Sequence, residues 1–265
     1  MDFNKFFDKN EKPLENLLPD AGFSAIFRKV GVVGDSLSSG EFEVLDANGI
    51  KAYHDFYEHS WGQYMARAMG SKVFNFSRGG MTAKWFCDSF GDKCGAWEYE
   101  NICDAYIIAL GCNDVNSIEL GTVDDVTYPA GYSNPETFAG YIGQIILRLK
   151  AKAPDAKFFL VSQPKAYFDG EGDGKIAKWK KDSAKLLHEI AEKVGNAYVI
   201  DLYEYAPTYD DEFKDSFYLL GHLNPMGYLL TAKMMMSYID YIIRHNMKDF
   251  TEVGLINTPY RNANL

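Results

Sequence analysis

A serine and an acid lie together where the first predicted strand ends. Residues 29–38 read KVGVVGDSLS, so Gly34, Asp35 and Ser36 directly follow a short apolar run. A serine hydroxyl becomes a nucleophile only when a base removes its proton. A preceding glycine allows a tight turn, whose backbone N–H groups can bind an oxyanion. The motif predicts a nucleophile at Ser36, although an isolated Gly-Asp-Ser-Leu is equally typical of a helix-capping serine.

The candidate base is one of five histidines. His222 lies in LLGHLNPMGY, between the fifth predicted strand and the last predicted helix. A loop at this point can reach the edge of a sheet that also carries Ser36, and imidazole accepts a proton near neutral pH. The remaining histidines lie in helical runs or polar stretches, where a solvent-facing side chain is the usual case: His54, His59, His188 and His245.

Donors for an oxyanion follow two further strands. NFSRGGMT contains Gly80, and GCND contains Asn113. The backbone N–H groups of Ser36 and Gly80 and the side chain of Asn113 could hold negative charge that develops on a carbonyl oxygen. Plain turns remain the alternative interpretation of both stretches.

Five apolar runs predict the strands that position these residues. They are apolar on consecutive positions, as in strands covered on both faces, and helical patterns separate them. This alternation favours an α/β fold with a parallel sheet, in which ligands bind at the carboxyl ends of the strands. The predicted strands are 30–33, 72–76, 105–110, 157–162 and 197–201, and the main predicted helices are 60–69, 134–149, 175–193 and 225–244.

The four site residues together resemble the GDSL, or SGNH, hydrolase superfamily. Its four signature letters fall in order on Ser36, Gly80, Asn113 and His222, and the similar stretch runs from about Val30 to Gly227. The resemblance implies a three-layer α/β/α, flavodoxin-like sandwich of about five parallel strands. It also implies a serine-dependent hydrolase of esters or related acyl bonds that uses neither a metal nor a cofactor.

The sequence departs from the family at the residue that normally orients the histidine. Family members usually carry an aspartate three residues before the histidine, and Leu219 stands there. Three hypotheses remain: a backbone carbonyl holds His222 in a Ser–His dyad, Asp215 takes the role from seven residues upstream, or the site is degenerate. Asp35 and Asp114 are expected to tie loops together by accepting hydrogen bonds from backbone N–H groups.

Aromatic residues make up 15% of the chain and suggest a carbohydrate substrate. Rings near a pocket can stack on sugar faces, although most such rings pack in a core. The main hypothesis is an esterase that removes a small acyl group, with acetyl as the expected group, from an oxygen, and saccharide esters are the expected substrates. The alternatives are a lipolytic or thioester hydrolase and a non-catalytic carbohydrate-binding protein. The rings concerned are Trp85, Trp97, Tyr99, Tyr128 and Tyr132.

Bulk properties exclude several other classes. The 265 residues suit one domain, with wrapping extensions at 1–27 and 246–265, and the net charge of −10 argues against nucleic acid or an anionic membrane as partner. Without a signal peptide the expected location is the cytoplasm, or outside the cell if a leader was trimmed. The four cysteines are expected to be reduced, with a Cys87–Cys94 bridge as the alternative. The sequence predicts no oligomeric state.

Overall fold

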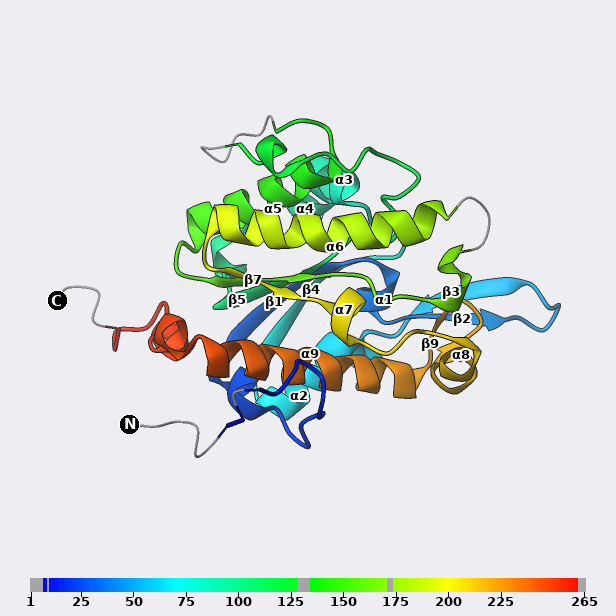
Figure 1. Ribbon diagram of the computed structural model, residues 1–265, viewed down its shortest axis with the longest axis horizontal. Helices are drawn as coiled ribbons and strands as arrows, with labels where there is room; N and C mark the ends of the chain where they lie inside the picture. Colours follow the sequence, from blue (N-terminus) through cyan, green and yellow to red (C-terminus); the bar gives the residue numbers. More distant parts are fainter. Residues whose placement is uncertain (1–6, 9, 128–133, 171–173, 262–265) are drawn as a thin grey trace.

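A five-stranded parallel sheet forms the centre of the computed structural model, which describes residues 7, 8, 10–127, 134–170 and 174–261 (Figure 1). The strand order is β4-β1-β5-β6-β7, and every neighbouring pair is parallel. The strands are β1 (Lys29–Gly34), β4 (Lys72–Ser77), β5 (Ala105–Ala109), β6 (Lys157–Val161) and β7 (Ala197–Ile200). All five match the predicted strands, with ends that differ by one residue at most.

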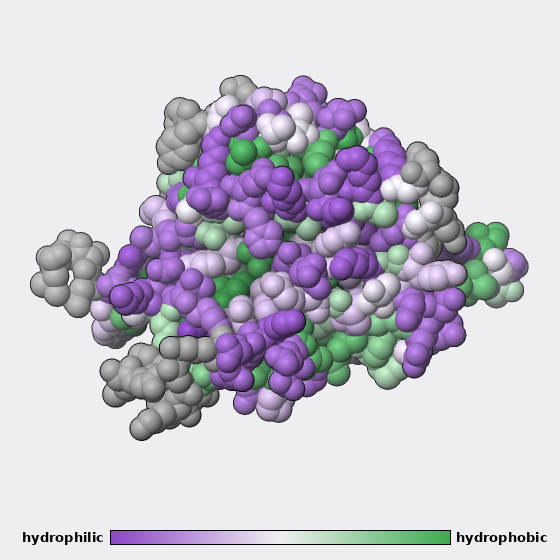
Figure 2. Space-filling model, in the orientation of Figure 1, coloured by the Kyte–Doolittle hydropathy of each residue, from purple (hydrophilic) through white to green (hydrophobic). Residues whose placement is uncertain are grey.

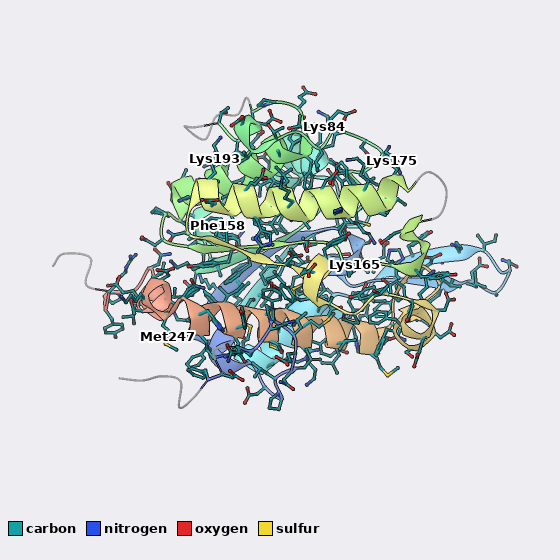
Figure 3. The ribbon with its side chains drawn as sticks, viewed as in Figure 1. Lys84, Phe158, Lys165, Lys175, Lys193 and Met247 are labelled. Carbon is teal, nitrogen blue, oxygen red and sulfur yellow. The ribbon has the colours of Figure 1, made fainter. Side chains whose placement is uncertain are left out.

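Helices cover both faces of the sheet and complete a three-layer α/β/α sandwich, as expected. In Figure 1, α5 (Phe138–Lys152) and α6 (Lys175–Val194) lie on one face, and α2 (Trp61–Met69) and α9 (Pro225–His245) on the other. Because successive strand residues point to opposite faces, consecutive apolar residues serve two cores. Phe158, labelled in Figure 3, packs in the core under α5 and α6, whereas Phe159 packs in the core under α9.

Two helix starts show how far local signals predicted these layers. The helix predicted over 60–69 has Ser60 as its N-cap, because the Ser60 side chain accepts a hydrogen bond from the Gln63 N–H. The helix predicted from residue 134 begins later, since the N-cap of α5 is Thr137, whose side chain accepts a hydrogen bond from the Gly140 N–H. Asn134 instead donates to the Gly140 carbonyl, so its side chain stabilises the loop before the helix.

An antiparallel hairpin that the sequence analysis did not predict projects from the sandwich beside the strand exits. It pairs β2 (Glu41–Leu45) with β3 (Lys51–Asp55) and joins α1 (Ser36–Ser39) to the segment before α2. Asp46 closes its turn by accepting hydrogen bonds from the Asn48 and Ile50 N–H groups. Leu45 and Ile50 are exposed near the tip, where Figure 2 shows a green protrusion at the right.

Several short elements complete the described part of the chain. A second small hairpin pairs β8 with β9, and its turn residue Leu220 has a left-handed φ of 54°. None of the described helices combines the length and apolarity that a membrane crossing requires. All four cysteines are free. The short elements are α3 (Ala83–Trp85), α4 (Gly91–Lys93), α7 (Leu202–Tyr205), α8 (Asp211–Phe217), β8 (Tyr218–Leu219) and β9 (His222–Leu223).

Candidate active site

The predicted nucleophile lies where the strand order of the sheet reverses. β1 lies between β4 and β5, and helix α1 begins with Ser36 directly after β1. Crevices of this kind, at the carboxyl ends of the strands, are the usual ligand sites of open α/β sheets. β9, which carries His222, packs against α1. The fold therefore brings Ser36 and His222 to the same edge, although they are far apart in the sequence.

The two predicted oxyanion donors lie on loops that are fastened to this edge. The Arg78 N–H donates to the Gly34 carbonyl, which holds the loop after β4 against the end of β1. Gly80 follows with a φ of +69°, a left-handed conformation that favours glycine. Asn113 Nδ2 donates to the Met81 carbonyl at 3.1 Å. An amide has two N–H donors, so the second remains for a substrate.

Asp35 and Asp114 act as loop ties, as the sequence analysis expected. Asp35 caps α1 by accepting the Leu37 N–H at 3.0 Å, and Asp114 accepts the Ala83 N–H at 2.9 Å. Both side chains are buried. Burial raises the pKa of Asp35 to about 7 and that of Asp114 to about 6. These acids hold the loops around Ser36 in place.

The raised pKa of Asp35 predicts a measurable pH dependence of stability. Between about pH 4 and 7 folded Asp35 keeps a proton that the unfolded chain has lost, so the free energy of unfolding falls as the pH rises through this window. Asp35→Asn removes the titration but keeps an acceptor for the Leu37 N–H. Relative to wild type, the variant should gain roughly 2 kcal/mol between pH 5 and 7, measured by urea unfolding. Parallel stability curves for the two proteins would contradict this reading of Asp35.

A carboxylate from the projecting hairpin holds the candidate base. Glu43 Oε2 on β2 lies 3.2 Å from His222 Nδ1. The same oxygen accepts a hydrogen bond from the Gly221 N–H at 3.0 Å. The left-handed turn at Leu220 leads the chain into Gly221, where a larger residue would collide with the Glu43 carboxylate. The β8–β9 turn thus brings the Gly221 N–H and His222 Nδ1 to the same oxygen of Glu43.

Glu43 is equipped to remain charged although it is buried. Its side chain is only 3% exposed, and Lys51 Nζ from the facing strand lies 2.5 Å from Oε1. The hydrogen bond from Lys51 lowers the pKa of Glu43 below its ordinary value, and the bonds from His222 and Gly221 act in the same direction, against the effect of burial. A charged acceptor on Nδ1 leaves Nε2 as the nitrogen that faces a reaction.

The structure places on His222 a group that the sequence analysis did not consider. Asp215 lies on α8 with an exposed side chain, and the carboxylate on His222 Nδ1 is that of Glu43. This contact is made by a carboxylate and not by the backbone carbonyl of the dyad hypothesis. Leu219 pairs with His222 across the small β8–β9 hairpin, with its side chain 42% exposed. The tight hairpin gives the loop another course, so position 219 cannot perform the role that the family gives it.

A second carboxylate, Glu41, approaches the opposite side of the same imidazole. Glu41 Oε1 lies 3.2 Å from His222 Nε2, and both side chains are about 15% exposed. Glu41 and Glu43 share one face of β2, since they are two residues apart on a strand. Burial raises the pKa of Glu41, while the nearby His222 acts to lower it. Both ring nitrogens of His222 therefore face a carboxylate.

Two of the aromatic residues that were expected near a sugar, Trp97 and Tyr99, lie away from this site. Trp97 is buried in the core beside α5, and Tyr99 is exposed with the Lys152 ammonium over its ring. Trp85 is 37% exposed and lies beside Arg78. A ring that the sequence analysis did not select packs against the candidate base: Tyr53 on β3 meets His222 edge-to-face, with centroids 5.8 Å apart. Tyr128 and Tyr132 lie outside the described residues.

A comparison with family models matches most of the sequence to a known protein family. Residues 32–230 match the GDSL-like Lipase/Acylhydrolase family. The chain belongs to this family. Its members hydrolyse acyl bonds, so this GDSL-like protein is an ester-hydrolysing enzyme. A search of curated protein sequences finds no significant match.

Solved structures with the same fold include several carbohydrate esterases. A family two carbohydrate esterase from Clostridium thermocellum in complex with cellohexaose has a TM-score of 0.59 at 13% identity, covering 84% of this chain and 65% of its own. A family two enzyme from Corynascus thermopiles (Myceliophthora fergusii) has a TM-score of 0.55 at 14% identity, covering 82% and 67%. Est24, a carbohydrate acetylesterase from Sinorhizobium meliloti, has a TM-score of 0.52 at 16% identity, covering 81% and 99%. At these identities the likeness shows the shared fold.

Proposed function

We propose that this GDSL-like protein is a serine esterase that removes small acyl groups, acetyl above all, from the hydroxyl groups of carbohydrates or similar alcohols. Ser36 is the nucleophile and His222 the general base. Glu43 completes the triad, and the Ser36 and Gly80 N–H groups with the Asn113 side chain form the oxyanion hole. The observation that carries the proposal is the buried Glu43 carboxylate on His222 Nδ1.

The reaction follows from these positions in two stages. In the first, Ser36 Oγ attacks the ester carbonyl while His222 Nε2 takes its proton, and the oxyanion hole holds the negative carbonyl oxygen. The tetrahedral intermediate expels the alcohol, which receives the proton from Nε2, and an acyl-enzyme remains on Ser36. In the second, water attacks the acyl-enzyme with the help of His222 and releases the acid. Glu43 stabilises the imidazolium that forms in both stages.

The cavity next to α1 offers no space for a long acyl chain. A mainly apolar cavity of about 90 Å³ lies beside α1, and its lining includes Leu37, Ser38, Cys112 and Leu223. Pockets for drug-sized ligands measure roughly 300–1,000 Å³. A cavity so much smaller has no room for a long acyl chain, and neither Ser36 nor His222 is among the residues that line it.

Two observations support a carbohydrate as the alcohol. The solved structures of the same fold include esterases described as acting on carbohydrates. Tyr53 is 54% exposed and stands against His222, where its ring can pack on the face of a sugar.

A series of esters of increasing chain length tests the proposal. The kcat/KM for 4-nitrophenyl acetate should exceed that for 4-nitrophenyl decanoate by at least about tenfold, because one apolar pocket discriminates roughly 10- to 200-fold per mismatched group. A preference for decanoate would instead identify a lipolytic enzyme. Absence of turnover on every ester would favour the carbohydrate-binding alternative.

A further inference from the structure

The carboxylate of Glu41 lies beside His222 Nε2, the nitrogen that the proposed mechanism needs. Glu43 holds Nδ1, so Nε2 must take the proton from Ser36, and Glu41 Oε1 lies 3.2 Å from Nε2. At this distance a protonated imidazole forms an ion pair with the Glu41 carboxylate. Glu41 therefore lies beside the nitrogen that must accept the proton, and its carboxylate must move before Ser36 can react.

The position of Glu41 coincides with the place of the leaving alcohol. Its carboxylate lies against Gly79, where an added Cβ would meet Glu41 Oε2 at 2.3 Å, and Gly79 precedes the proposed oxyanion donor Gly80. A general acid must come within about 2.6–3.2 Å of the oxygen that it protonates. Because Nε2 protonates the leaving oxygen, that oxygen takes the point where Glu41 Oε1 now lies. A displaced Glu41 then remains next to the alcohol.

The strand holds the backbone of Glu41, whereas its side chain is held only by its contact with His222 among the described hydrogen-bonding and ionic partners. The Tyr228 hydroxyl donates to the Glu41 carbonyl at 2.6 Å, and Glu41 pairs with Asp55 across the hairpin. A glutamate side chain has three rotatable bonds, so the carboxylate can leave Nε2 without a shift of the strand. Among the described residues, His222 is the one hydrogen-bonding or ionic partner of this carboxylate.

Displacement therefore takes a largely buried carboxylate away from its ionic partner His222. The Glu41 side chain is 16% exposed, and leaving such a group without a hydrogen bond costs free energy. An alcohol with a hydroxyl close to its ester oxygen can supply the missing donor. A simple alkyl alcohol cannot, so its ester bears the full cost of displacing Glu41.

We propose that Glu41 is a specificity-determining residue that fills the leaving-group position of the empty site and selects esters of polyhydroxy alcohols by accepting a hydrogen bond from a hydroxyl next to the ester. The proposal rests on the proposed function, because it assumes that Ser36 and His222 perform the hydrolysis. It adds to that function a residue and a chemical reason for the choice of alcohol.

The test compares wild type with Glu41→Gln and Glu41→Ala on a matched pair of esters. Glycerol monoacetate and propyl acetate have the same carbon skeleton and differ in two hydroxyl groups. The ratio of kcat/KM for the first to the second should fall about tenfold or more in Glu41→Ala, the typical effect of losing one hydrogen bond to a charged group. Labelling of Ser36 by a fluorophosphonate should become about tenfold faster in the same variant, because Nε2 is freed. Glu41→Gln keeps the shape of the side chain, so its kcat/KM ratio and its labelling rate should lie between those of wild type and Glu41→Ala.

The outcomes separate the proposal from a structural role and from the proposed function. A merely structural role of Glu41 would slow both acetates alike and leave their ratio unchanged, and an unchanged ratio overturns the proposal whatever the labelling rate. Slower labelling in both variants, with unchanged melting temperatures, overturns it as well. If wild type itself is neither labelled at Ser36 nor active on either acetate, the proposed function has failed, and the proposal falls with it.

Discussion

Ser36→Ala is expected to lower kcat for 4-nitrophenyl acetate by about 10⁵-fold or more, since the loss of a nucleophilic serine removes nearly all of the rate that a triad supplies. KM should change little, because the hydroxyl is a small part of the binding surface. The measurement is the steady-state rate on protein freed of contaminating esterases. A residual rate within tenfold of wild type would exclude Ser36 as nucleophile.

Ser38→Ala provides a matched control on the same short helix. Residues two positions apart on a helix point in nearly opposite directions, and Ser38 lies buried on the lining of the apolar cavity. The same chemical change at Ser38 should therefore leave the rate within a few-fold of wild type. Comparable losses in both variants would point to a folding defect of α1.

Glu43→Gln is expected to lower kcat by roughly 10⁴-fold, the loss typical of triads that lose their acid. Both oxygens of Glu43 have partners. Oε1 forms an ion pair with Lys51, and Oε2 forms hydrogen bonds with the Gly221 N–H and His222 Nδ1. An amide has only one oxygen, so it must turn its NH₂ group toward one of these donors. Turned toward His222, it holds the imidazole in the wrong tautomer. Turned toward Lys51, it meets an ammonium and loses the negative charge.

Asp215→Asn is the control for this variant, because it makes the same chemical change at the acid that the sequence suggested. Asp215 is exposed on α8, so the rate should remain within about twofold of wild type, as for surface positions generally. A rate that falls with Asp215→Asn and persists with Glu43→Gln would assign the orientation of His222 to Asp215 and not to Glu43. Melting temperatures of both variants show whether a lost rate reflects chemistry or unfolding.

The layers and most of the candidate site could be predicted from the sequence because each depends on local signals. Strands buried on both faces are apolar on consecutive positions, and β6, which reads KFFLV, is buried throughout. A parallel sheet then places all strand exits at one edge, so Ser36 and Asn113 belong together whatever the loops do. The helix caps were less certain, since Asn134 and Thr137 are both good N-cap residues and the loop contacts decide between them.

The orienting acid could not be found by searching near the histidine, because it comes from a strand about 180 residues away in the sequence. The resemblance directed attention to Leu219 and then to Asp215, which are close to His222 in the sequence. The carboxylate that contacts His222 Nδ1 belongs to Glu43. A signal for the hairpin was nevertheless present: residues 41–55 read EFEVLDANGIKAYHD, with alternating polar and apolar residues before a turn containing Asn-Gly. That the hairpin brings Glu43 to His222 depends on tertiary packing, which no local pattern predicts.

Fluorophosphonate labelling of wild type and His222→Ala, followed by peptide mapping, tests most directly whether Ser36 is a nucleophile activated by His222. We expect one phosphonyl group per wild-type chain, attached to Ser36, and labelling at least about 10³-fold slower in His222→Ala. A label on another residue, or equal labelling of the two proteins, would contradict the proposed active site.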